Sequence, residues 1–368
     1  MKLQCSQTTL IEALNNVTRA VPQKSTIAVL EGIKFVLVKN SLELTGYDLE
    51  MGIQTKISVD SEDYGEFVIS ARLFTEIIRK MDSETINVEI DDKLKVTVSG
   101  DNAEYNISAV SAEEYPSLPD YDTGDSFSFP QAVLKNMINQ TIFAVAVDDK
   151  KPVLTGELFD IENGSFNLVA IDGYRLAIRH EAIKSDNRYY FVVKAKALNE
   201  VAKLLKDDEK SEVLLHVSKK HIVFEINGYM VISRLLEGDY HNYKASVPAN
   251  STTEIIIKTK ELISSLERCS LLINEKMKAP IKCVFDEGMV KITCSTPLGK
   301  FSDEIPADIS GKRVEIGFNC RYLSDAVKAA ESDKIKMFSN GGLAPMKIVP
   351  LEGDAYTFLV LPVRLKSE

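Results

Sequence analysis

The stretch FVISARLFTEIIRKM (67–81) decides the fold, because its pattern occurs three times in the chain. It predicts a short β-strand that runs directly into an amphipathic helix, with apolar residues at helical spacing. The same pattern returns in FVVKAKALNEVAKLL (191–205) and in VEIGFNCRYLSDAVKAA (314–330). Self-similarity at a constant spacing predicts a protein built from three related modules.

The copies are separated by a nearly constant number of residues. Phe74, Leu198 and Leu323 occupy the same place in the pattern, 124 and then 125 residues apart. Asp48 and Asp172, in LTGYDLEMGI and LVAIDGYRLAI, keep the 124-residue spacing outside the helix. The repeat therefore extends beyond the motif into the segments around it.

A second helix precedes each copy by about sixty residues. Its apolar positions recur at helical spacing and are Leu10, Leu14, Val17 and Val21, then Leu134, Ile138 and Val145, then Leu262, Leu266, Cys269 and Ile273. Other stretches alternate with a period of two, which predicts half-buried antiparallel strands, as in Ile53, Thr55, Ile57 and Val59 or in Leu94, Val96 and Val98. Each module is thus predicted to be an α+β domain, with two helices packed on one face of antiparallel sheets of about eight strands. The six expected helices span 8–21, 71–81, 130–142, 194–206, 258–271 and 319–330.

The joints between modules are marked by tyrosines and by turn-forming residues. Tyr115 and Tyr240, 125 residues apart, each lie near the end of a module. DYDTGDSFS (120–128) and SVPANST (246–252) follow them and carry the Gly, Pro and acidic residues typical of linkers. The predicted domains are 1–123, 124–248 and 249–368.

Charge is distributed unevenly along the chain. The net charge of -10 would by itself argue against a nucleic-acid partner. The six expected helices, however, hold 14 Lys and Arg against 6 Asp and Glu, whereas the rest of the chain holds 30 against 48. Most of these helical cations fall off the apolar stripes, and they are Arg72, Arg79, Lys80, Lys135, Lys194, Lys196, Lys203, Lys206, Lys258, Lys260, Arg268, Arg321 and Lys328.

Basic helices with an acidic remainder suit a polyanion such as duplex DNA, whose charge density is about one per 1.7 Å of axis. The helices carry no recognition motif, zinc finger or run of stacking aromatics, so binding to the phosphate backbone without base readout is expected. The alternative is that the lysines are merely solvated on outer helix faces.

Several classes of protein are disfavoured by what the sequence lacks. No run of eighteen apolar residues occurs, and the start MKLQCSQTTL has no secretion pattern, so we expect a cytoplasmic protein that does not enter a membrane. The five cysteines are scattered without CxxC spacing, which favours buried free thiols over disulfides or zinc. The four histidines have no metal-ligand spacing, and no nucleotide or nucleophile motif is present. We expect no catalysis, no cofactor and no metal.

Four motifs carry a resemblance to a known family. They are IDGYRLA (171–177), SRLLEGDYHNY (233–243), FNCRYL (318–323) and LVLPVRL (359–365). In this order and at these separations the chain resembles, over its whole length, the β subunit or sliding clamp of bacterial DNA polymerase III. The resemblance implies three clamp domains per subunit and a head-to-tail homodimeric ring around duplex DNA. It also implies, as partners, the polymerase catalytic subunit, the clamp loader, repair polymerases, mismatch-repair proteins and ligase.

The resemblance implies a hydrophobic pocket between the second and third domains that takes a short extended peptide of these partners. Its residues would be Leu154, Ile171, Gly173, Tyr174, Arg175, Leu176, His241, Ser246, Asn319, Tyr322, Leu343, Pro345, Leu359, Leu361, Pro362, Val363, Arg364 and Leu365. Leu and Val would form the walls, Gly173 would permit close backbone approach, and Arg175 or Arg364 would donate at the rim. Without the companion motifs, LVLPVRL would be read as an edge strand ended by proline.

The family match extends to DNA loops and to a subunit interface. Lys24, Lys150 and Lys151 correspond to basic loop positions, although Asp148 stands where an amide is common. The interface would pair Tyr105 and Ile107 of one subunit with Leu271 and Leu272 of the other, residues that could instead be ordinary core. The chain also departs from the family pattern at Tyr174, His241 and Pro345, and Lys366, Ser367 and Glu368 extend past the usual end and could partly cover the groove.

Two other functions stay open at this point. Asp148, Asp149 and Asp172 could bind magnesium in a nuclease, although the repeat partner of Asp172, Asp48, suggests a structural role at a strand turn. A scaffold that binds peptides but never encircles DNA is the second alternative.

Overall fold

The computed structural model describes the chain except residues 121–124, 149, 185–186, 209, 274–278 and 366–368. In the described residues one order of elements occurs three times: a strand, a helix, four strands, a second helix and three strands. This order confirms three repeats of two helices and about eight strands. Its cause is the recurring change from period-two to helical hydrophobic spacing.

The first repeat comprises β1 (Lys2–Ser6), α1 (Gln7–Val17), β2 (Gly32–Val38), β3 (Ser41–Tyr47), β4 (Met51–Ser58), β5 (Gly65–Ser70), α2 (Ala71–Lys80), β6 (Thr85–Ile90), β7 (Lys95–Gly100) and β8 (Ala103–Ser108). The second comprises β9 (Ser126–Pro130), α3 (Gln131–Thr141), β10 (Gly156–Glu162), β11 (Ser165–Ile171), β12 (Arg175–Ala182), β13 (Tyr189–Lys194), α4 (Ala195–Leu204), β14 (Glu212–Val217), β15 (His221–Ile226) and β16 (Tyr229–Leu236).

The third repeat comprises β17 (Thr253–Lys258), α5 (Thr259–Ser270), β18 (Ile281–Asp286), β19 (Met289–Thr296), β20 (Gly299–Gly311), β21 (Val314–Phe318), α6 (Cys320–Ala329), β22 (Lys334–Ser339), β23 (Met346–Val349) and β24 (Tyr356–Val360). Short 3₁₀ helices follow or connect these elements: η1 (Thr18–Ala20), η2 (Ala28–Glu31), η3 (Ile142–Ala144), η4 (Pro152–Thr155) and η5 (Tyr243–Ser246). The six α-helices agree with the predicted ranges, and the expected ends at 21 and 142 fall just outside α1 and α3 because their last turns are 3₁₀.

The described chain forms two compact units. Unit 1 consists of Met1–Lys135 and Ala197–Leu235, and unit 2 of Asn136–Lys196 and Leu236–Glu368. The division passes through the second repeat. The predicted domain bounds stay a prediction.

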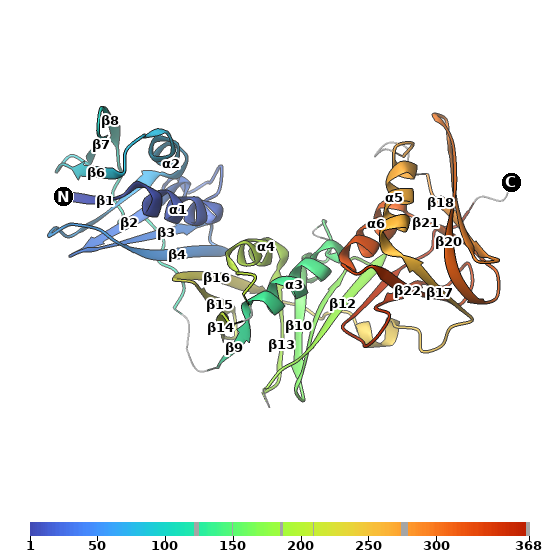
Figure 1. Ribbon diagram of the computed structural model, residues 1–368. Coiled ribbons are helices and arrows are strands. Elements are labelled where there is room, and N and C mark those ends of the chain that lie inside the picture. Colours follow the sequence, from blue (N-terminus) through green and yellow to red (C-terminus); the bar gives the residue numbers. More distant parts are fainter. Residues whose placement is uncertain (121–124, 149, 185–186, 209, 274–278, 366–368) are drawn as a thin grey trace. The chain divides into compact units, whose positions relative to one another are not determined.

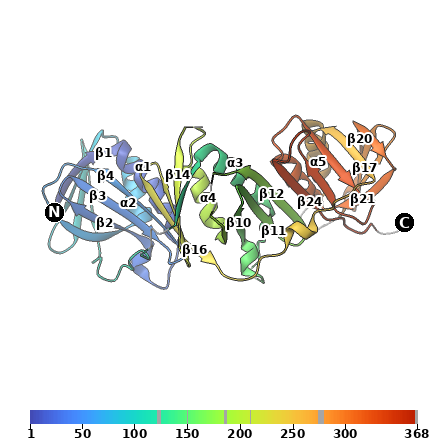
Figure 2. The same cartoon turned by 90° about the horizontal axis from the view of Figure 1, so that it is seen from below.

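Unit 1 holds two antiparallel sheets. One has the strand order β1-β6-β7-β8. The other runs β5-β2-β3-β4-β16-β15-β14-β9, so that strand β4 of the first repeat pairs with strand β16 of the second. Helix α1 contacts β3, β4 and α2 (Figures 1 and 2). The helices of the first repeat thus pack on its sheet, as the α+β prediction requires.

Unit 2 repeats this construction. One sheet runs β13-β10-β11-β12-β24-β23-β22-β17-β20, and β12 of the second repeat pairs with β24 of the third. The other runs β21-β18-β19-β20. Helices α5 and α6 lie side by side and pack on these sheets (Figure 1). Their core includes Leu266, Phe318 and Phe358, all fully buried.

The burial of most strands follows the predicted alternation. In β4, Ile53 and Thr55 are buried while Lys56 is exposed, and in β7, Val96 and Val98 are buried. Leu94 differs from the prediction, because it lies in the turn before β7 with a φ of 59° and is only half-buried. All five cysteines are buried free thiols, as predicted. No helix in the described residues has both the length and the apolar character needed to cross a membrane.

Candidate partner-peptide pocket and nucleic-acid interface

The IDGYRLA motif forms a tight turn between β11 and β12. The Asp172 side chain accepts hydrogen bonds from the backbone N–H groups of Tyr174 (2.8 Å) and Arg175 (3.0 Å). Gly173 between them has a φ of 89°, a conformation that glycine adopts at little cost. A Cβ there would meet nothing within 4 Å in the chain itself, so the close approach of a peptide to Gly173 stays a prediction. The glycine serves the backbone conformation of the turn.

The first repeat contains the same turn between β3 and β4. Asp48 accepts from the N–H groups of Glu50 (3.0 Å) and Met51 (2.7 Å), and Leu49 takes the positive φ, 72°. The structural role predicted for Asp172 from its repeat partner is therefore confirmed. Asp149 of the magnesium alternative lies outside the described residues, and the described chain has no cluster of three His, Cys, Asp or Glu side chains suited to a metal ion.

Arg175 lies buried behind this turn. Its Nε is 3.0 Å from Asp172 Oδ2, and its Nη1 is 2.5 Å from Asp325 Oδ2 on α6. The guanidinium also lies 4.5 Å from the centre of the Tyr322 ring, at cation–π distance. Of the two residues predicted as rim donors, Arg175 is buried and its charge joins the second repeat to the third, whereas Arg364 is exposed.

The apolar residues of the predicted pocket meet on neighbouring strands. Ile171 pairs with Leu176 across β11 and β12, and Leu176 pairs with Leu359 across β12 and β24. All three belong to one hydrophobic cluster, and Leu154 of η4 packs against it. The structure thus brings together side chains that are more than 200 residues apart in sequence, as the pocket prediction requires.

The segment after β24 is held by its backbone. Leu361 N donates to Tyr174 O (2.9 Å) and Val363 N donates to Gly317 O (2.8 Å). A Cβ at Gly317 would lie 2.4 Å from Val363 O, so only glycine allows this contact. LVLPVRL is therefore a strand with an anchored extension, whose Leu361, Val363 and Arg364 side chains are exposed. Pro362 and Leu365 are half-buried, and 366–368 lie outside the described residues.

Other predicted pocket residues line the surface around the cluster. Tyr174, 62% exposed, stacks on Tyr322 with ring centres 6.0 Å apart. His241 Nε2 lies 2.9 Å from Ser246 Oγ. Asn319 is the N-cap of α6 and accepts from the N–H groups of Arg321 and Tyr322, so its side chain is engaged in the helix.

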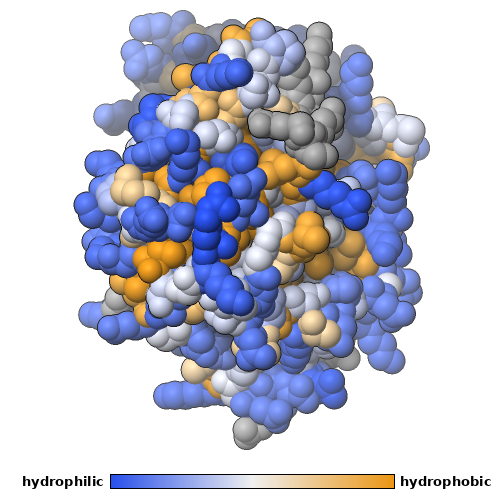
Figure 3. Space-filling model, turned by 90° about the vertical axis from the view of Figure 1, so that its right-hand side faces the viewer, coloured by the Kyte–Doolittle hydropathy of each residue, from blue (hydrophilic) through white to orange (hydrophobic). Residues whose placement is uncertain are grey.

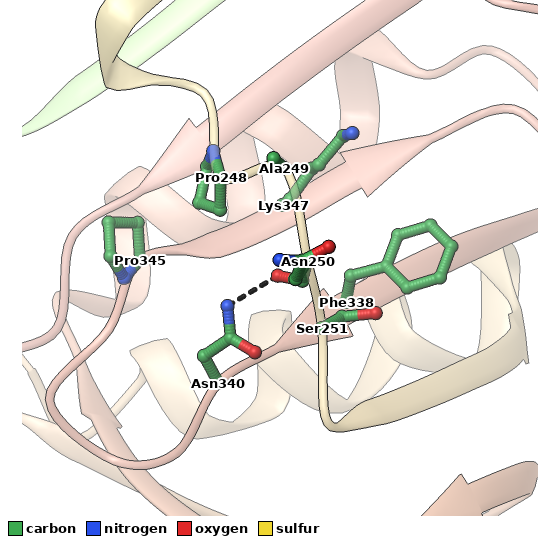
Figure 4. Close-up of a pocket in the computed structure, with 8 residues that line it drawn as sticks. All are labelled: Pro248, Ala249, Asn250, Ser251, Phe338, Asn340, Pro345 and Lys347. Atoms are coloured by element: carbon green, nitrogen blue, oxygen red, sulfur yellow. Dashed lines mark hydrogen bonds between the residues drawn. The ribbon is translucent and has the colours of Figure 1, made fainter.

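Leu343 and Pro345 lie in the turn before β23. Pro345 also borders a hollow that is distinct from the hydrophobic cluster. The hollow has a volume of about 170 Å³, and residues 248–251, which join the second and third repeats, form part of its lining (Figure 4). It is lined by Pro248, Ala249, Asn250, Ser251, Phe338, Asn340, Pro345 and Lys347. Of the predicted pocket residues, only Pro345 belongs to it, whereas Leu343 is largely exposed.

The pocket residues predicted from the sequence did not include Tyr240, Tyr243 and Val247, which pack in or against the same hydrophobic cluster. The repeat contained a signal for Tyr240. Its hydroxyl donates to Val169 O (3.0 Å), just as the Tyr115 hydroxyl donates to Thr45 O (3.2 Å) one repeat earlier. Tyrosine at this position thus bonds the end of the first and of the second repeat to a strand of its own sheet.

Strand β10 carries a fully buried carboxyl group, that of Glu157. Burial raises the pKa of Glu157 well above its ordinary value, and the hydrogen bond to Thr141 Oγ1 (2.8 Å) only partly opposes this. Thr141 Oγ1 also lies 2.8 Å from Met137 O, which can only accept. A single hydroxyl proton cannot serve both contacts, so a protonated Glu157 that donates to Thr141 satisfies the chain of bonds.

The cations predicted to face DNA lie at the surface. Fourteen of the sixteen are exposed and two, Lys135 and Lys194, are half-buried. On α2, for example, Phe74, Ile77 and Ile78 are buried while Arg72 and Lys80 are exposed, as the helical spacing predicted. The same division holds on α4, α5 and α6, where the exposed cations are Lys196, Lys203, Lys260, Arg268, Arg321 and Lys328.

Within the described residues, at least eight of these sixteen cations form ion pairs with neighbouring carboxylates. The pairs are Arg79–Glu76, Lys135–Asp207, Lys150–Asp148, Lys203–Glu200, Lys258–Glu261, Arg268–Asp303, Arg321–Asp325 and Lys328–Glu267. Exposed pairs of this kind contribute about 0–1 kcal/mol each, so a phosphate can replace the carboxylate at little cost. Within the described chain, no ion pair forms at Lys24, Arg72, Lys80, Lys151, Lys206 or Lys260.

The predicted interface residues lie on sheet edges or beside them. Strand β8, with Tyr105 and Ile107, pairs with β7 alone in the described residues and is largely exposed. In the described part of unit 2, residues 299–306 of β20 pair with β19 on one side only. Leu271 is 81% exposed, and Leu272 lies next to Gly299 at the start of β20. Figure 3, viewed from the side of β20, shows hydrophobic side chains among hydrophilic ones on this face.

Three α+β repeats that share sheets through β4–β16 and β12–β24 define a protein of the clamp fold. The chain belongs to the DNA polymerase III beta subunit family. The family models for the N-terminal, central and C-terminal domains match residues 1–119, 128–242 and 244–364.

Relatives match along nearly their full length. The beta sliding clamp of Bacillus subtilis (strain 168) is 32% identical, over 99% of this chain and all of that protein. The beta sliding clamp of Halalkalibacterium halodurans is also 32% identical, over 96% and 97%. The crystal structure of the Bacillus subtilis DNA polymerase sliding clamp is 31% identical with a TM-score of 0.95, covering both chains completely. The beta subunit structure from Streptococcus pyogenes is 25% identical with a TM-score of 0.94, over 99% of this chain and all of that one.

Proposed function

We propose that this chain is a cytoplasmic DNA sliding clamp, which encircles duplex DNA without reading its sequence and tethers the replicative polymerase. One observation carries the proposal: the whole chain consists of three clamp repeats whose helices carry exposed cations while the remainder is acidic. It has no catalytic role of its own and acts as an accessory subunit of the polymerase.

The repeated strand pairings support a closed ring of two copies. Ile53 of β4 pairs with Val231 of β16, and Ala177 of β12, 124 residues after Ile53, pairs with Phe358 of β24. The equivalent strand of the third repeat is β20, and the equivalent last strand of the first repeat is β8. Among the described residues both have a free edge, so β20 of one copy can pair with β8 of another in a head-to-tail homodimer. Tyr105 and Ile107 would then meet Leu271 and Leu272.

The exposed cations support contact with the phosphate backbone. We propose that the sixteen cations face the duplex; they lie on the helices, on the residues that flank them, and in the loops at 24 and 150–151. Their attraction to phosphates would be the same at every base pair, so these contacts would not read the base sequence. Contacts of this kind suit a protein that must slide along DNA.

The test is retention on DNA. After loading by a clamp loader, the protein should stay on circular duplex and run off linear duplex, whereas a peptide-binding scaffold would show no difference.

Replacing Lys196 and Lys203 by Glu should weaken DNA association and lower its salt dependence by about one power of salt concentration for each lost phosphate contact. The matched control is Glu at Lys219 and Lys220, which lie exposed on the β14–β15 turn and change the net charge equally. Equal effects of the two double variants would refute the assignment of the helices to DNA.

The hydrophobic cluster and the anchored segment 361–365 support a partner-peptide pocket within unit 2. We propose that Leu154, Ile171, Leu176 and Leu359 form its floor, Leu361 and Val363 its wall, and Arg364 its rim donor. Its ligands would be short extended segments of the polymerase catalytic subunit, the clamp loader, repair polymerases, mismatch-repair proteins and ligase. The domain bounds 1–123, 124–248 and 249–368 belong to the same proposal.

Asp172 does not support the nuclease alternative. One of its oxygens accepts hydrogen bonds from backbone N–H groups of the turn, and the other pairs with Arg175. Incubating the purified protein with magnesium and labelled duplex tests it. Cleavage would favour the enzyme.

A further inference from the structure

The segment 241–247 borders the proposed pocket, and it is fastened by a buried carboxylate. Asp160 on β10 is 5% exposed and accepts a hydrogen bond from the Tyr243 hydroxyl at 2.6 Å. The same oxygen lies 2.9 Å from the Lys244 ammonium. A carboxylate that is removed from water needs such partners, because an unpaired buried charge is costly.

Asp160 lies on the face of β10 that meets the pocket. Side chains of a strand alternate, so Asp160 points to the same side as Leu158, which belongs to the hydrophobic cluster with Ile171, Leu176 and Leu359. Tyr243 is buried in that same cluster. The Asp160–Tyr243 hydrogen bond therefore joins strand β10, beside the proposed floor of the pocket, to the segment 241–247.

The rest of the segment supplies further residues of the proposed pocket. Tyr240 before it is fixed by its hydroxyl on Val169 O. Between and after the two tyrosines lie His241 and Ser246, which contact each other, and Val247, which packs against the cluster. Two tyrosine anchors thus set the backbone path of 241–247, and only the second depends on a charge.

We infer that Asp160 is a positioning residue of the partner-peptide pocket: by holding Tyr243 and Lys244 it fixes the segment 241–247 in the conformation that receives the peptide. The inference rests on the proposed function, because it concerns the same pocket. A pocket that is fixed in advance binds more tightly than one that must be ordered by its ligand.

The first measurement needs no partner. Hydrogen–deuterium exchange of the segment 241–247 is compared among the wild type, Asp160→Ala, Tyr243→Phe and Glu162→Ala. The Glu162→Ala control removes a carboxylate from the same face of the same strand, where Glu162 pairs with Arg188 at the surface. Loss of a charge-assisted hydrogen bond should speed exchange about tenfold or more in the first two variants and leave the control unchanged. Wild-type exchange in Asp160→Ala and Tyr243→Phe would overturn the inference.

The second measurement is the affinity for the DNA polymerase III catalytic subunit of the same organism, by surface plasmon resonance. Asp160→Ala and Tyr243→Phe should each bind about tenfold more weakly than the wild type and than Glu162→Ala, with dimer formation unchanged. The double variant should bind no more weakly than Asp160→Ala alone, because the Asp160–Tyr243 hydrogen bond that Tyr243→Phe removes is already absent in Asp160→Ala. Faster exchange with wild-type affinity would overturn the positioning role and leave the clamp function intact. A wild type that fails to bind the subunit would refute the proposed pocket, and this inference with it.

Discussion

The buried Glu157 makes a specific prediction for stability against pH. Burial holds its pKa well above 4.5 in the folded protein, whereas in the unfolded chain the carboxyl is solvated. The folded state therefore retains a proton that the unfolded state releases. Its contribution to stability is fully present below the unfolded pKa and is lost as pH rises toward the folded pKa.

Replacing Glu157 with Gln removes this proton exchange and nearly preserves the shape of the side chain. Over the pH range in which only the folded state is protonated, one proton changes the free energy of unfolding by about 1.4 kcal/mol per pH unit. The wild type should lose that amount per unit above pH 4.5 relative to Glu157→Gln. The absolute stability is a poorer readout, because Glu157 Oε2 has no hydrogen-bond partner within the described residues and an amide nitrogen there would also lack one.

The assay is urea unfolding of both proteins at half-unit steps from pH 5 to 8, with Glu162→Gln on the same strand as the control for an exposed carboxylate. The difference in unfolding free energy between the wild type and Glu157→Gln should change steadily with pH, while the Glu162→Gln difference stays nearly flat. Parallel curves for the wild type and Glu157→Gln would mean that Glu157 is ionised in the folded protein and would refute the reasoning.

Three further changes have expected outcomes. Gly173→Ala should lower the free energy of unfolding by about 1 kcal/mol in urea, because its φ is positive, but the protein should still fold, since Leu49 occupies the equivalent position; an unchanged midpoint would contradict this. Asn319→Ala removes the N-cap of α6 and should cost about 1 kcal/mol in thermal unfolding, whereas Asn319→Asp should retain most of the stability. Leu271→Asp should convert dimers to monomers in analytical ultracentrifugation without changing circular dichroism, and persistent dimers would exclude Leu271 from the interface.

Local patterns predicted the elements of the fold. The starts of α2, α4 and α6 follow from the change in hydrophobic period within each repeated motif, so the helices were placed to within about two residues. The structural role of Asp172 was also within reach, because Asp48 repeats it at a fixed spacing. These features depend on residues that are close in sequence or related by the repeat.

The contacts that escaped prediction join distant segments. Arg175 was expected at a rim, and only the position of Asp325, 150 residues later, makes it a buried brace. The need for glycine at 317 depends on a strand extension that ends at residue 365. The bond between Asp160 and Tyr243 likewise crosses 83 residues. A single sequence does not show which distant residues contact each other, because each partner alone resembles an ordinary surface residue.

Strand β20 has a mechanical consequence. Its thirteen residues pair with β19 over the first part and with β17 over the last, so one uninterrupted backbone belongs to both sheets of unit 2. A load applied to its outer edge, such as the pull of a partner that separates two copies, would be transmitted along the covalent chain into the sheet that holds Leu359.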